Sequence, residues 1–208
     1  MASESWRSSL RPRIAETRAA LAQATLDGLV QRGGLVLHPD GMALDLVGKR
    51  YVVRWPELVV VEEATGEESP EELQALVLDY LVGADGSSPT GRWLGFRELP
   101  HGGFYWQAFQ GYSGDDLARS LNGDTASFRR GAERLAGSPV ALGDAAYAFR
   151  ALPNVPLAVV WWQGDEEFPP RAAVLFDAVD SHYLPTDGLA ILGRMLCRRL
   201  IKLGTEQG

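Results

Sequence analysis

The chain has 208 residues, of which 46% are hydrophobic and 23% are charged, and its formal net charge is −7 at pH 7. This length and composition predict one globular domain, or one domain with a small appended lobe, whose core needs no metal or disulfide. The negative charge argues against a nucleic-acid-binding protein, because such proteins usually carry a basic surface. The single cysteine, Cys197, excludes an intrachain disulfide and a cysteine-ligated zinc or iron–sulfur site within the chain.

Signals for membrane insertion and for secretion are missing from the sequence. No run approaches the roughly 18 apolar residues that a transmembrane helix needs. The opening residues, MASESWRSSLRPR, lack the apolar core of a signal peptide. We therefore expect a cytoplasmic protein that binds neither membranes nor nucleic acids.

The N-terminal part of the chain predicts a helix, a small β-rich region and a second helix. Apolar residues recur three and four apart over residues 11–32, and Gly33-Gly34 should end that helix. Ser69, followed by Pro70 and Glu72, is typical of the start of the second helix. Between the helices, short apolar runs joined by turns predict four strands, at residues 35–37, 42–46, 50–55 and 58–61.

A stretch rich in glycine, serine and proline, residues 83–91, is the clearest linker signal in the chain. We expect it to divide an N-terminal lobe, residues 1–84, from a main lobe, residues 85–208, unless the two form one continuous domain. A Pro-His-Gly-Gly turn is flanked by two segments rich in apolar and aromatic residues, 92–98 and 104–109. They therefore predict a β-hairpin.

The remaining sequence predicts further helices and a second hairpin. Asp124 should cap a short helix, and residues 145–151 predict a strand. Apolar runs at residues 157–163 and 172–177 flank an acidic turn, which predicts paired antiparallel strands near the centre of a sheet. A helix with an apolar stripe should begin near Thr186. Because hairpins and helices come in runs, we expect an α+β fold with a mainly antiparallel sheet and packed helices.

Five short motifs are distributed over residues 91–177: GRWLGFREL, GGFYWQAF, GDAAYAF, GDEEFP and LFD. Together they resemble the uncharacterised prokaryotic domain-of-unknown-function family DUF3786. The resemblance implies a family with no established activity that occurs largely in anaerobes and has links to one-carbon and corrinoid metabolism. Some relatives carry a cysteine-rich iron–sulfur segment. This chain lacks those cysteines, so the resemblance gives no argument for a bound cluster here.

The candidate ligand-binding residues belong to the acidic turn, to the strand and helix that follow it, and to the aromatic region before it: Asp165, Glu166, Glu167, Asp177, His182, Arg97 and Trp106. We expect Phe168 to pack against the body of the protein and to fold the carboxylates back over the sheet edge. In the metal-dependent alternative, carboxylate oxygens and the imidazole of His182 bind Mg²⁺, Mn²⁺ or Zn²⁺. The ordinary alternative is a solvated, charged hairpin tip.

Arg97 and Trp106 each have a functional and a structural interpretation. An arginine at a strand end can bind a carboxylate or phosphate, whereas an ion pair with Glu98 would give it only a surface role. Trp106 and its aromatic neighbours can line a ligand pocket, or they can pack in the core.

We expect the protein to be an accessory or small-ligand-binding protein. Two alternatives stay open. The first is a metal-dependent enzyme that uses the carboxylate cluster, and the second is a structural partner that docks through the basic face of the last helix, at Arg194, Arg198 and Lys202. The sequence identifies no cofactor, and it leaves open whether the protein is an enzyme and whether its partner is a small molecule or a protein.

Overall fold

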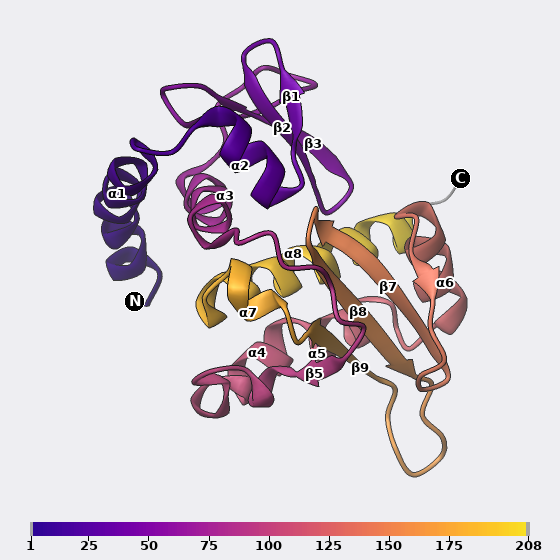
Figure 1. Ribbon diagram of the computed structural model, residues 1–208. Helices are drawn as coiled ribbons and strands as arrows, with labels where there is room; N and C mark the ends of the chain where they lie inside the picture. Colours follow the sequence, from indigo (N-terminus) through magenta and orange to yellow (C-terminus); the bar gives the residue numbers. More distant parts are fainter. Residues whose placement is uncertain (1, 207–208) are drawn as a thin grey trace.

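The computed structural model describes residues 2–206, with side chains from residue 10 onward, and it has the predicted α+β fold (Figure 1). Two antiparallel sheets, one of four strands and one of five, form its β structure. Figure 1 shows the four-stranded sheet at the top and the five-stranded sheet below it. No helix in this part of the chain has a stretch long and apolar enough to cross a bilayer.

The N-terminal helical region consists of two helices, α1 (Ala2–Leu21) and α2 (Leu26–Gly33), where the sequence predicts one. The chain turns between them because Thr25 caps α2, and its hydroxyl accepts a hydrogen bond from Gly28 N at 3.2 Å. Gly34 ends α2 in the left-handed conformation, at φ 62°. The prediction of one continuous helix is therefore wrong, whereas its C-terminal end at the glycine pair is confirmed.

The four-stranded sheet pairs its strands in chain order, and every pair is antiparallel. All four predicted strands are present, each within one residue of its predicted bounds. They are β1 (Val36–His38), β2 (Gly41–Leu46), β3 (Lys49–Arg54) and β4 (Val59–Glu62).

The next helix, α3 (Glu71–Gly83), begins where the sequence predicts it. Ser69 does not cap it, because the first helical residue follows Pro70 and no side chain accepts the free N–H groups. The hydroxyl of Ser69 is buried and has no hydrogen-bond partner among the described residues. The predicted serine cap is therefore wrong.

Only residues 93–95 of the predicted hairpin form a strand, and the segment from Phe96 onward is helical. Phe96 and Phe109 are both buried, and their rings stack with centroids 4.2 Å apart. Gly102 lies directly against the carbonyl oxygen of Phe96, where any side chain would collide. Asp124 caps α6 as predicted and accepts two backbone hydrogen bonds. The elements are β5 (Trp93–Gly95), the short 3-10 helices η1 (Phe96–Glu98) and η2 (Gly102–Phe104), α4 (Trp106–Tyr112), α5 (Gly114–Ser120) and α6 (Thr125–Arg134).

The five-stranded sheet has the strand order β5-β9-β8-β7-β6. β8 is its middle strand and pairs antiparallel with β7 on one side and β9 on the other. The predicted central hairpin is thus confirmed, and Phe176 on β9 is fully buried. The four further strands are β6 (Ser138–Pro139), β7 (Ala145–Leu152), β8 (Val155–Trp162) and β9 (Arg171–Asp177).

Two helices complete the fold, the short α7 (Asp180–Tyr183) and the long α8 (Thr186–Thr205), which begins at the predicted residue. One buried apolar cluster contains residues from both sheets, such as Met42 from β2 and Val159 from β8. The sheets lie on either side of residue 84 in the sequence. The division into two lobes stays a prediction.

Candidate functional site

The acidic turn, residues 163–170, connects β8 to β9 and closes on itself. One oxygen of Asp165 accepts hydrogen bonds from Glu167 N and Phe168 N, both at 2.9 Å. Asp165 N in turn donates to the carbonyl of Phe168 at 2.9 Å. The carboxylate of Asp165 therefore builds the turn, while Glu166 and Glu167 are exposed. The side chain of Phe168 is 65% exposed, so the expectation that it packs against the body of the protein is wrong. The hydrogen bonds within the turn hold its shape without that packing.

Asp177, at the other end of β9, is fully buried and binds the linker, residues 83–91, at Thr90 and Gly91. Its carboxylate accepts hydrogen bonds from Thr90 N at 3.0 Å, from the Thr90 hydroxyl at 2.7 Å and from Gly91 N at 2.6 Å. Val179 N donates to it at 2.9 Å. Burial acts to raise the pKa of Asp177, but these hydrogen bonds outweigh burial and leave the pKa below its ordinary value. Asp177 is therefore a structural anchor for the linker.

Asp180, which the sequence analysis does not single out, is a second fully buried aspartate. It accepts one hydrogen bond, from Asp177 N at 2.8 Å. Its other oxygen has no partner among the described residues. Burial, and to a lesser extent the charge of Asp177, raise the pKa of Asp180 to about 8. The repeat of aspartate three residues after the strand-ending Asp177 is the sequence signal that could have identified it.

His182 lies on the surface beside the linker. Its Nδ1 is 2.8 Å from a carboxylate oxygen of Asp85 and 3.3 Å from the hydroxyl of Ser87. The hydrogen bond from His182 lowers the pKa of the exposed Asp85 to about 2. A serine hydrolase triad needs the serine and the acid on opposite imidazole nitrogens, whereas both partners of His182 meet the same nitrogen. The arrangement fixes the linker and does not activate Ser87.

The predicted carboxylate cluster does not form. Asp177 ends β9 six residues after Arg171, which places it roughly 20 Å along the strand from the acidic turn. Across the residues with defined positions, no three histidine, cysteine or acidic side chains could hold one metal ion. The metal-site alternative thus fails on geometry, because the length of β9 separates its candidate ligands.

Arg97 and Trp106 do lie together, on a different surface. The guanidinium carbon of Arg97 is 6.0 Å from the centroid of the Trp106 ring, within range of a cation–π interaction. None of the ion pairs formed by the described side chains includes Arg97. Phe104 is 97% exposed, the largest value for any large hydrophobic side chain described, and Tyr105 is 51% exposed. We call the surface formed by Arg97, His101, Phe104, Tyr105 and Trp106 the aromatic patch.

The packing beneath the aromatic patch explains its shape. Phe96 and Phe109 are stacked in the core, and both also contact the ring of Phe176 at 5.8 Å between centroids. The carboxylate of Glu98 accepts a hydrogen bond from Gly95 N at 2.6 Å, so it serves the local turn. The aromatic residues of this region are thus divided, because some build the core and others face solvent. The sequence pattern predicts strands for these residues and does not distinguish the buried rings from the exposed ones.

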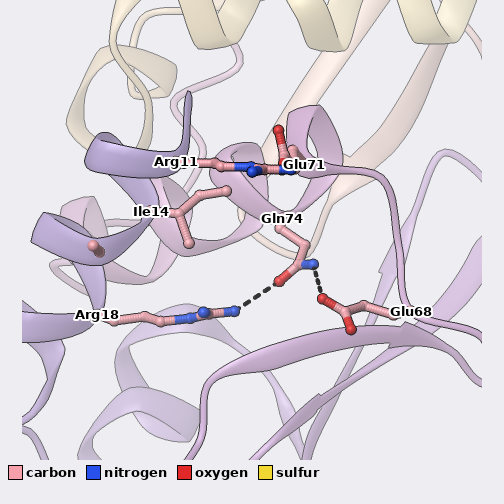
Figure 2. Close-up of a pocket in the computed structure, with 7 residues that line it drawn as sticks. Arg11, Ile14, Arg18, Glu68, Glu71 and Gln74 are labelled. Atoms are coloured by element: carbon pink, nitrogen blue, oxygen red, sulfur yellow. Dashed lines mark hydrogen bonds and ion pairs between the residues drawn. The ribbon is translucent and has the colours of Figure 1, made fainter. Parts of the chain in front are cut away.

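Two hollows lie elsewhere on the molecule. Figure 2 shows the first, of ≈ 180 Å³, between α1 and α3, where Gln74 joins Arg18 to Glu68 by hydrogen bonds of 2.9 and 2.6 Å. Its polar groups satisfy one another. The second, of ≈ 490 Å³, lies along residues 139–147, where Arg129 donates to the carbonyl of Asp144 at 3.1 Å. None of the seven candidate residues lines either hollow.

The basic face of α8 is partly used by the fold. Arg194 forms an ion pair with Glu72 on α3, which joins the two helices. The Nζ atom of Lys202 lies 3.9 Å from a carboxylate oxygen of Glu206, the residue directly after the helix. Of the three cations considered as a docking face, only Arg198 has no acidic partner among the described side chains. Two of these three cations are therefore already paired with acidic residues of the same molecule.

Comparison with known proteins identifies the family. The sequence model described as a domain of unknown function (DUF3786) matches residues 25–199. The match contains the acidic turn, the linker and the aromatic patch, and α1 lies N-terminal to it. No curated protein and no solved structure was found to match the chain. Because the matched region covers most of the sequence, the chain belongs to the DUF3786 family.

Proposed function

We propose that this protein is an accessory protein that binds an acidic, aromatic-containing segment of a protein on the aromatic patch. The observation that carries the proposal is the exposure of Phe104, at 97%, beside an arginine without an ionic partner among the described residues. A phenylalanine left in water forgoes about 1.5–3 kcal/mol of burial. Apolar side chains gathered on a surface with a polar rim are typical of interaction sites.

The chemistry of the aromatic patch supports this class of partner. A guanidinium that rests on the Trp106 ring keeps N–H groups for a carboxylate, which it can bind through two parallel hydrogen bonds. Phe104 and Tyr105 offer ring faces and edges to a further aromatic side chain. Arginine, tyrosine and tryptophan are also the residues that most often dominate binding energy at interfaces.

The net charge of the molecule sets how strong this binding can be. At −7, the whole protein repels an acidic partner at long range, so electrostatic steering does not speed association. The favourable contributions to the binding free energy arise only on contact, and the contact surface is small. We therefore expect weak, transient complexes, with dissociation constants in the micromolar range or above.

We do not propose the metal-dependent alternative, because the length of β9 separates two of its candidate ligands, Asp165 and Glu167, from the other two, Asp177 and His182. The setting implied by the family resemblance, anaerobic one-carbon and corrinoid metabolism, stays part of the proposal, as does the cytoplasmic location expected from the sequence. That setting rests on the motifs GDEEFP and LFD and their neighbours alone.

The test is calorimetric titration of the full chain with two amidated peptides, EEFEEF and the charge-reversed KKFKKF. We expect only the acidic peptide to bind, and we expect Phe104→Ser and Arg97→Gln each to weaken its binding at least tenfold. Trp162→Ser is the matched control, because Trp162 is also an exposed aromatic, at 41%, but lies outside the patch. Equal binding of both peptides, or a loss caused by the control alone, would refute the proposal.

A further inference from the structure

We propose that the aromatic patch binds the acidic turn of a second copy of this chain. The inference rests on the proposed function and names its partner. It starts from another exposed aromatic ring outside the patch, Phe168, which follows two exposed carboxylates, Glu166 and Glu167, in the sequence.

The acidic turn is already in one defined shape before it meets a partner. Asp165 holds it through two backbone hydrogen bonds of 2.9 Å, and a third bond of 2.9 Å joins its ends. Pro169 and Pro170 restrict the backbone that follows. A segment fixed in this way loses little conformational entropy on binding, which favours association.

The acidic turn and the aromatic patch are complementary in chemistry. The turn presents two carboxylates and one ring, and the patch presents a guanidinium, an imidazole and three rings. Glu166 and Glu167 can meet Arg97, and Phe168 can pack against Phe104 and Tyr105. The charges of the two surfaces are thus opposite, and their exposed rings can pack together.

The two surfaces of one molecule are too far apart to meet. Figure 1 shows the loop between β8 and β9 projecting at the lower right, whereas α4, next to the aromatic patch in the sequence, lies at the lower left. The complementary contact therefore has to be made between two molecules. Because it joins two different surfaces, each copy keeps a free turn or a free patch unless the assembly closes.

The experiment is sedimentation velocity over protein concentrations from about 10 µM to about 1 mM. We expect the sedimentation coefficient of the wild type to rise with concentration. A turn variant, Glu166→Lys/Glu167→Lys/Phe168→Ser, and a patch variant, Arg97→Glu/Phe104→Ser, should each remain monomeric. Trp162→Ser should behave like the wild type, and circular dichroism should show the same fold for all four proteins.

The decisive sample is an equal mixture of the turn variant and the patch variant. One intact patch and one intact turn are present in that mixture, so we expect a one-to-one complex that grows no further. A monomeric wild type at every concentration, association that survives in either variant, or a mixture that stays monomeric would overturn the proposal. If EEFEEF binds the wild type in those cases, the proposed function stands and only the identity of the partner is wrong.

Discussion

Asp177 and Asp180 are two buried aspartates, three residues apart, whose pKa values move in opposite directions. Asp177 accepts hydrogen bonds from the linker and from Val179, and these favour its charged form. Asp180 accepts a single backbone hydrogen bond and is surrounded by the core, which favours its neutral form. The number of N–H groups that reach each carboxylate therefore determines which one is ionised at neutral pH.

The raised pKa of Asp180 makes stability depend on pH. Its pKa is about 8 in the folded protein and 3.8 as an ordinary value, so the stabilising contribution is complete below about pH 4 and is lost as pH rises through 8. Asp180→Asn is neutral throughout. We expect its free energy of unfolding in urea to change less from pH 5 to pH 9 than that of the wild type, by a few kcal/mol.

Glu166→Gln is the matched control for this measurement, because it removes one carboxylate at an exposed position. It should leave the pH profile of the wild type unchanged. Parallel profiles for the wild type and Asp180→Asn would show that Asp180 does not titrate in this range. The lowered pKa of Asp177 changes stability in the opposite direction. Its contribution to the free energy of unfolding is present at neutral pH and is lost as the pH falls through the lowered pKa.

At the scale of elements, the linker depends on its bonds to the end of β9. Asp177→Ala leaves the N–H groups of Thr90 and Gly91 without their acceptor. The cost is at most about 1–3 kcal/mol each, because both residues are exposed and water can replace part of the lost bonding. We expect faster amide hydrogen exchange over residues 86–92 and lower stability. Thr90→Ala removes one side-chain bond and should have a smaller effect in the same direction. Unchanged exchange over the linker in Asp177→Ala would mean that other contacts hold it.

Some elements follow directly from the sequence, and others depend on contacts that a sequence pattern does not contain. Buried elements are visible in the sequence as apolar patterns. The prediction is therefore correct for β8 and β9, which are apolar runs, and for α8, which has an apolar stripe. The segment after β5 is rich in aromatic residues with no clear period, and the prediction of a hairpin there is wrong. Its helices form because Gly102 packs on the carbonyl of Phe96 and because Phe96 stacks on Phe109. Both are tertiary contacts, which the local sequence pattern does not predict.

The sequence predicts only part of the candidate site, because the distances between its residues depend on the fold. Arg97 and Trp106 are close in sequence and meet in the fold, as their spacing allows. Asp165 and Asp177 flank one strand, and the length of that strand keeps them apart. Phe168 was expected to be buried because it is aromatic, but the hydrogen bonds of Asp165 close the turn without its help.

At the scale of the whole molecule, the binding surface and the acidic turn occupy different ends of one fold. A single buried cluster links both sheets to the helices, so the aromatic patch is supported by a rigid core while its outer rings stay in water. This arrangement suits a protein that presents a preformed surface to a partner. It also means that Phe104 can be replaced with little effect on folding, since its side chain contributes almost no buried area.

The most direct test of the central claim is amide chemical-shift mapping of the isotopically labelled protein during titration with EEFEEF. We predict that the largest shifts fall within residues 96–106 and that they disappear in Phe104→Ser, whose spectrum should otherwise match that of the wild type. Shifts centred on the acidic turn, on α8 or on the hollow along residues 139–147, with residues 96–106 unchanged, would contradict the assignment of the aromatic patch as the binding surface.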